Sequence, residues 1–186
     1  MNEIEKELKR QENFLKLNLP IFTDQTQIDN TRNKIIETAI KLKGVKFAHR
    51  GRTRFGIDCL GLDWISYRRS GITLPDGDGR VYEANWFMFC EEERYLEQIL
   101  KYFKWVEIHQ KKNKPTLSNI KKGDIPLFRC FNNKITHCGL FIYNDNDIFI
   151  HAFSGSKVKP DSLSQKWFYH RYVGFVRYRG FMGKGE

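Results

Sequence analysis

No apolar run in this 186-residue sequence approaches the ~18 residues needed to cross a membrane. The first twenty residues alternate charged and apolar side chains, and they lack the apolar core and cleavage site of a secretory signal. We therefore expect no membrane span and synthesis in the cytoplasm without a signal peptide. Internal repeats and low-complexity segments are also missing, which excludes repeat and fibrous architectures.

The four cysteines lack the spacing of a metal site, because no two of them form a C-x-x-C pair. Structural zinc sites usually draw on pairs of ligands a few residues apart. We therefore expect no metal and no cofactor. In a cytosolic chain such cysteines are most simply free thiols. They are Cys59, Cys90, Cys130 and Cys138.

The sequence is rich in aromatic and basic residues. Aromatic residues make up 15% of the chain, which predicts one packed domain that needs no disulfide to fold. Lys and Arg outnumber Asp and Glu by 32 to 22. Residues 1–29 hold four basic and six acidic residues, so the basic excess lies in residues 30–186. This excess favours a polyanionic partner, such as nucleic acid, an acidic glycopolymer or an anionic membrane, although solubility alone also explains it.

The order of predicted elements indicates an α+β fold, with a helical first half and an antiparallel β-sheet in the second half. Residues 1–29 are expected to form an accessory arm, followed by one domain over residues 30–186. Apolar periodicity predicts helices over residues 31–43, 59–70 and 84–103. Short β-rich runs follow Pro115 and predict strands over residues 125–130, 136–143, 147–153 and 172–178.

Cys59 stands at the predicted start of a helix, after the glycine-bearing basic loop of residues 49–56. The free amide groups and dipole of a helix start stabilise a thiolate and lower its pKa. A nucleophilic cysteine needs such a placement. The other three cysteines lie inside predicted helix or strand runs and are interpreted as small buried residues.

A thiol nucleophile also needs a base, and two histidines lie on neighbouring predicted strands, His137 and His151. One imidazole can pair with the thiol while a second group orients that imidazole. A structural role is the alternative for each histidine.

The register of the two strands decides whether the histidines can cooperate. A four-residue turn pairs His151 with Leu140 and puts the histidines on opposite faces. A loop one residue longer, or a β-bulge, pairs His151 with Gly139 and brings it to the face of His137. We predict the second arrangement, with Cys59 close enough to His137 for a hydrogen bond.

Three segments share a pattern: GIDCLGLDWISYRRSGI opens a helix with D-C-x-G-L, KKGDIPLFRC carries a G-D strand, and HCGLFIYNDNDIFIHAF forms a hairpin with two histidines. Together they resemble the NlpC-type cysteine peptidases, a papain-like family that hydrolyses peptidoglycan stem peptides. The resemblance implies Cys59 as nucleophile, His137 as base and His151 as the orienting third residue. It also implies cleavage next to D-glutamate.

Further segments narrow the resemblance to the phage-tail and gene-transfer-agent branch of that family. They are GVKFAHRGR, ANWFMFCEEERYLEQIL and KWFYHRYVGFVRYR. The resemblance implies a cysteine endopeptidase acting on peptidoglycan stem peptides, with phage-tail proteins as further partners. Its expected location is a virion tail, or the medium after lysis.

Residues around the nucleophile are expected to contact the substrate: Phe47, His49, Asp58 and Leu60. Two of them depart from the family pattern, since Leu60 stands where the family often has Ser and Phe47 where it often has Tyr. Without that Tyr hydroxyl, the backbone amide of Cys59 is the expected oxyanion donor, with His49 as a substitute.

Other functions stay open. The chain could be an inactive tail-tip subunit of the same fold, or a thiol amidase or acyltransferase with another substrate. Nucleic-acid binding is disfavoured, because no recognition motif is present. Four basic residues outside the motifs are expected to bind the anionic wall: Lys157, Lys159, Lys166 and Arg171.

Overall fold

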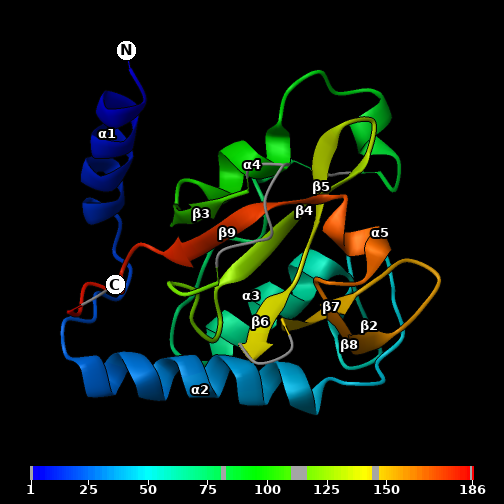
Figure 1. The fold of residues 1–186 in the computed structure, drawn as a ribbon, viewed down its shortest axis with the longest axis horizontal. Helices are drawn as coiled ribbons and strands as arrows, with labels where there is room; N and C mark the ends of the chain where they lie inside the picture. Colours follow the sequence, from blue (N-terminus) through cyan, green and yellow to red (C-terminus); the bar gives the residue numbers. More distant parts are fainter. Residues whose placement is uncertain (1, 81–82, 110–116, 144–146, 185) are drawn as a thin grey trace.

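The computed structural model describes residues 2–80, 83–109, 117–143, 147–184 and 186, and its elements form the predicted α+β fold (Figure 1). The helices are α1 (Glu3–Leu15), α2 (Gln25–Lys41), α3 (Cys59–Arg69), α4 (Arg94–Ile99) and α5 (Lys166–Tyr169), with the 3₁₀ helix η1 (Trp86–Met88). The strands are β1 (Arg52–Thr53), β2 (Gly56–Ile57), β3 (Phe103–Ile108), β4 (Ile125–Phe131), β5 (Lys134–Cys138), β6 (Leu140–Tyr143), β7 (Ile148–Ala152), β8 (Val158–Ser162) and β9 (Tyr172–Tyr178). Among the described segments, no helix has both the length and the apolar character that crossing a membrane requires.

Two antiparallel sheets share the second half of the chain. One has the strand order β3-β9-β4-β5 and the other has the order β6-β7-β8, while β1 and β2 form a separate pair. Gly139 is the single residue between β5 and β6, so the predicted strand over residues 136–143 is split between the two sheets. This split brings a strand of each sheet next to α3 (Figure 1).

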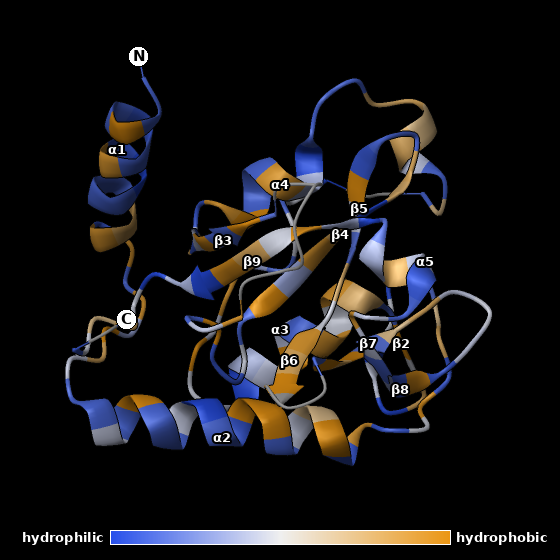
Figure 2. Ribbon diagram, viewed as in Figure 1, coloured by the Kyte–Doolittle hydropathy of each residue, from blue (hydrophilic) through white to orange (hydrophobic). Residues whose placement is uncertain are grey.

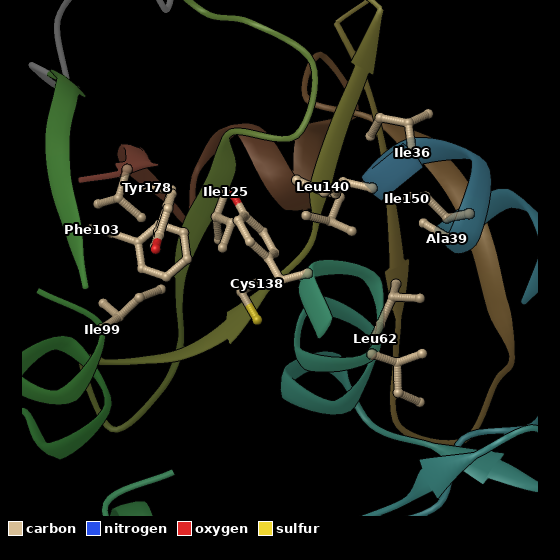
Figure 3. Packing of buried hydrophobic residues seen from close by; sticks show 14 of the residues in the cluster. Ile36, Ala39, Leu62, Ile99, Phe103, Ile125, Cys138, Leu140, Ile150 and Tyr178 are labelled. Carbon is tan, nitrogen blue, oxygen red and sulfur yellow. The ribbon is translucent and has the colours of Figure 1, made fainter. Parts of the chain in front are cut away.

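The main core lies between the helices and the sheets. Figure 3 shows Ile36 and Ala39 of α2 facing Leu140 and Ile150, with Leu62 of α3 close by. All five side chains are at most 6% exposed. Figure 2 shows the matching sequence pattern, in which apolar residues alternate with polar ones along α2. The buried face of α2 therefore holds the three-stranded sheet in place.

A second, smaller core is mostly aromatic and lies against the two histidines. Its buried members are Ile120, Phe128, Phe141, Phe149, Leu163, Phe168, Tyr172 and Phe175.

Helix α2 begins at Gln25, earlier than the predicted start at Thr31. The Asp24 side chain accepts a hydrogen bond from the backbone N–H of Gln27 at 2.9 Å and caps the helix there. The predicted boundary between residues 29 and 30 consequently falls inside a continuous helix. Asp24 therefore caps the helix in place of Asp29, which lies within the second turn.

The single helix predicted for residues 84–103 is wrong. This segment holds η1, the short helix α4 and the first residue of β3. Glu93 interrupts the helical pattern, because its carboxylate accepts the N–H of Ile135 at 3.1 Å and pairs with Arg129. Tertiary contacts with β4 and β5 thus override the local helical preference.

The N-terminal segment packs on the end of β9. Phe14 of α1 is 1% exposed and lies edge-on to Tyr178, with ring centroids 5.6 Å apart. Arg179 donates hydrogen bonds to Glu7 at 2.6 Å and Gln11 at 3.2 Å. Helix α1 is therefore docked on the body of the protein by both apolar and ionic contacts.

Candidate active site

Helix α3 begins at Cys59, and Asp58 fixes this start. One oxygen of Asp58 accepts the N–H of Gly61 at 2.7 Å and pairs with Arg52 at 2.7 Å, while the other accepts the N–H of Arg50 at 2.9 Å. Asp58, which was expected to contact substrate, thus caps the helix and ties the basic loop to it. Its carboxylate is 6% exposed.

Glycines allow this loop to lie directly on the helix start. A Cβ atom on Gly61 would sit 2.1 Å from the carbonyl oxygen of Gly51. A Cβ on Gly51 would sit 2.4 Å from the carbonyl oxygen of Gly56. Neither contact tolerates a side chain, so the glycines keep the loop backbone against the nucleophile.

His137 on β5 and His151 on β7 are joined by a hydrogen bond, with 2.8 Å between Nε2 of His137 and Nδ1 of His151. The register pairs Leu140 with Ile150, which places His151 opposite Gly139, and a β-bulge follows further along the hairpin. The predicted same-face arrangement of the two histidines is confirmed. The turn at residues 144–146 lies outside the described residues.

Asp161 on β8 extends this arrangement, with 2.9 Å between its Oδ2 and Nε2 of His151. It also accepts hydrogen bonds from Lys159 at 2.7 Å and Gln165 at 3.0 Å. Lys159, one of the four residues predicted to bind the wall, therefore belongs to the site.

The sequence pattern does not predict Asp161, because Pro160 argues against a strand at this point. Strand β8 is an edge strand, where proline is tolerated. Alternation along β8 puts residues 159 and 161 on one face, with Lys159 opposite His151.

Burial and hydrogen bonding control the protonation of His137, His151 and Asp161. It lowers the pKa of His137 well below the ordinary value, and the nearby His151 lowers it further. Burial also lowers the pKa of His151, although Asp161 acts in the opposite direction. Burial acts to raise the pKa of Asp161, but hydrogen bonds from Lys159 and His151 hold it below its usual range. At neutral pH the site therefore holds two neutral imidazoles and one ionised carboxylate.

Cys59 and His137 line one cleft of about 300 Å³, together with Phe47, His49 and Trp86. Three of the residues expected to contact substrate, Phe47, His49 and Asp58, thus line the cleft beside the nucleophile. The hydrogen bond expected between Cys59 and His137 is not formed in the described part of the chain. Such bonds are often long in the absence of substrate and tighten when it binds.

A smaller pocket of about 90 Å³ adjoins the cleft and shares Cys59, Trp86 and Thr136 with it. Leu60 lines it together with Trp86 and Tyr95 and contributes an apolar wall. The two adjoining hollows give an extended substrate room next to the thiol.

The remaining cysteines differ from Cys59 in environment. Burial raises the pKa of Cys130 to about 12 and that of Cys138 well above its ordinary value. Cys90, expected inside a helix, lies in the turn between η1 and α4. Cys59 alone among them combines a helix start with a place in the histidine-lined cleft. This arrangement is suited to nucleophilic acyl transfer.

Comparison with known proteins agrees with this chemistry. A model of the NlpC/P60 family matches residues 44–177. The chain is 25% identical over 144 residues to an Escherichia coli K12 protein named murein DD-endopeptidase MepS/murein LD-carboxypeptidase. The match covers 77% of this chain and 61% of that protein, so the chain spans about three fifths of the curated relative's length.

Solved structures share the fold. An NlpC/P60 family protein from Bacillus cereus aligns with a TM-score of 0.55 at 21% identity, covering 79% of this chain and 40% of that one. An NLP/P60 family protein from Staphylococcus aureus aligns with a TM-score of 0.56 at 18% identity, covering 88% and 44%. These likenesses establish the papain-like architecture.

Proposed function

The chain belongs to the NlpC/P60 family, and from that premise we propose that it is a cysteine endopeptidase acting on peptidoglycan stem peptides. One observation carries the proposal: Cys59 opens α3 in the same cleft as His137, which is hydrogen-bonded to His151. A cysteine placed in this way, with an oriented imidazole, is the arrangement that thiol-based amide hydrolysis requires.

The reaction follows from these placements. The Cys59 sulfur attacks the amide carbonyl carbon while its proton passes to His137. The backbone N–H of Cys59, the first residue of α3, has no acceptor within the helix and stabilises the oxyanion. The C–N bond then breaks, and His137 gives its proton to the leaving amine. Water attacks the resulting thioester, a proton returns to sulfur, and the carboxylic acid product leaves.

The substrate class is supported by the name of the Escherichia coli relative, a murein endopeptidase and carboxypeptidase. The aromatic walls of the cleft, from Phe47, Trp86 and Phe153, suit an extended peptide. Cleavage next to D-glutamate is part of the proposal and rests on the resemblance of the motif segments.

A narrower part of the proposal places the protein in a phage or gene-transfer-agent tail, or in the medium after lysis. It is supported by the resemblance of the segments around residues 44–52, 84–100 and 166–179 to that branch. Mass spectrometry of purified particles tests it, since the chain should be recovered with the tail proteins.

The test of activity is mass spectrometry of stem-peptide digests with the wild type and with Cys59→Ala. We expect new amino termini from the wild type and from a Cys90→Ala control, and none from Cys59→Ala. Equal cleavage by Cys59→Ala would refute the assignment. A folded wild type that binds wall without cutting it would identify the inactive structural subunit. A covalent adduct on Cys59 from another acyl donor would indicate an amidase or acyltransferase.

A further inference from the structure

Asp161 ends a chain of hydrogen bonds that reaches the catalytic cleft. The chain runs from its Oδ2 to Nε2 of His151 at 2.9 Å, and from Nδ1 of His151 to Nε2 of His137 at 2.8 Å. Both nitrogens of His151 and one nitrogen of His137 are thereby engaged. Nδ1 of His137 is the ring nitrogen that remains for the proton of Cys59.

The donors and acceptors along this chain decide whether His137 can act as a base. To accept a proton at Nδ1, a neutral His137 must carry its own proton on Nε2, which then donates to Nδ1 of His151. His151 must in turn be protonated on Nε2. The opposite tautomer of His151 would donate to His137, force the proton of His137 onto Nδ1, and leave no acceptor for the thiol.

An ionised carboxylate selects the productive tautomer, because it accepts hydrogen bonds and cannot donate one. Asp161 is held in position by Lys159 and Gln165, and its side chain is 11% exposed. The titratable groups that face His151 are His137 on β5 and the pair Lys159 and Asp161 on β8. The uncharged ring of Phe168, on α5, also packs on His151. Among these neighbours of His151, Asp161 therefore supplies the negative charge.

We infer that Asp161 is a positioning residue of the active site: through His151 it fixes the tautomer in which His137 can take the proton of Cys59. This inference rests on the proposed function for the identity of the nucleophile and base. Asp161 thereby becomes the fourth member of a relay that also comprises Cys59, His137 and His151. It does not depend on which peptide the enzyme cleaves.

The experiment measures the rate of Cys59 alkylation by iodoacetamide between pH 5 and 10, with peptide mapping to follow Cys59 alone. In Asp161→Ala we expect the rate at neutral pH to fall about tenfold or more, since outer partners that orient histidines have effects of this size. At high pH, where the thiolate forms without a base, the rate should equal that of the wild type. This limit shows that access to the thiol is unchanged.

Two variants complete the comparison. Asp161→Asn can keep its carbonyl oxygen toward Lys159 and His151, so it should recover part of the lost rate. Asp29→Ala removes an exposed carboxylate on α2 and should match the wild type. An alkylation profile of Asp161→Ala that coincides with the wild type would overturn the inference.

A measurement on the unmodified protein guards against a variant that fails to fold. Nitrogen-15 NMR of labelled histidines reports the tautomer directly, and we expect the proton of His151 on Nε2. A proton on Nδ1 would overturn the inference. If the alkylation rates separate as expected but no stem peptide is cut, the relay stands and the proposed substrate fails.

Discussion

Asp63 lies one helical turn after Cys59, and neither of its carboxyl oxygens has a hydrogen-bond partner in the described structure. Burial raises the pKa of Asp63 well above its ordinary value, and the neighbouring Cys138 thiol offsets this only in part. Burial therefore favours the neutral, protonated form of this carboxyl group. A neutral group here spares the nucleophile a negative charge on its own helix.

This protonation predicts a dependence of stability on pH. A carboxyl group with a raised folded-state pKa stabilises the fold fully below its ordinary pKa, about 4, and loses that contribution as pH rises toward the folded value. Asp63→Asn removes the titration. Its free energy of unfolding relative to the wild type should therefore increase from pH 4 to pH 7.

Urea unfolding at several pH values measures this difference. Asp29→Asn, on the exposed side of α2, changes the same charge without burial and should run parallel to the wild type. Parallel curves for Asp63→Asn as well would show that Asp63 is ionised in the folded protein.

At the same scale, the sequence allowed Cys59, His137 and His151 to be predicted, because a helix start and two strand motifs mark them locally. Asp161 could not be found in this way. Its role depends on β8 pairing with β7, and Pro160 concealed that strand. The capping role of Asp58 follows from a local signal, an aspartate directly before the helix start, whereas its hydrogen bond from Arg50 depends on the loop folding back on it.

At the scale of the elements, the link between β5 and β6 sets the positions of His137 and His151 relative to each other. Gly139 lies in this link, where an added Cβ would sit 2.6 Å from the carbonyl oxygen of Ile150 and 3.0 Å from Cβ of His151. Gly139→Ala must displace β7 relative to β5, since the closest contact is with backbone. We expect kcat/KM to fall about tenfold or more, because small displacements of catalytic groups have large effects.

The matched control is Gly71→Ala, past the end of α3. Gly71 has a φ of +99° with open space around it, so alanine costs about 1 kcal/mol in stability without moving the site. Thermal melts and kinetics of both variants separate the two effects. Equal losses of kcat/KM in the two variants would contradict a special role for Gly139.

Local sequence patterns predict some of the helices and strands but not others. The strands β4, β7 and β9 were predictable from short apolar runs, whereas residues 84–103 were not. There, Glu93 bonds to β5 across the fold, a contact that no helical periodicity contains. The bulge between β6 and β7 was predictable only by requiring the two histidines to share a face.

For the whole molecule, composition overstates the basic surface. Arg177 is 2% exposed and pairs with Asp124 at 2.7 Å, while Arg179 is 1% exposed and pairs with Glu7. Lys159 pairs with Asp161 in the active site. A count of charges along residues 157–179 cannot distinguish such paired residues from unpaired ones that face solvent.

Lys157 lies directly before β8 and Lys166 is the first residue of α5, and both are exposed. Figure 1 shows these elements on the side of the molecule away from α1. If this side meets the anionic wall, Lys157→Glu with Lys166→Glu should weaken sedimentation with insoluble wall by about tenfold or more, because each lysine near an anionic surface contributes about 1 kcal/mol. The remaining binding should depend less on salt.

The same double variant should cleave a small soluble stem peptide at the wild-type rate, because neither lysine touches the relay. Reversing Lys9 and Lys34 instead changes the net charge equally on α1 and α2, and it should leave sedimentation nearly unchanged. An equal loss in both double variants would mean that only the total charge matters. A loss on the soluble peptide would mean that these lysines act on catalysis, since a short peptide does not depend on attachment to the wall.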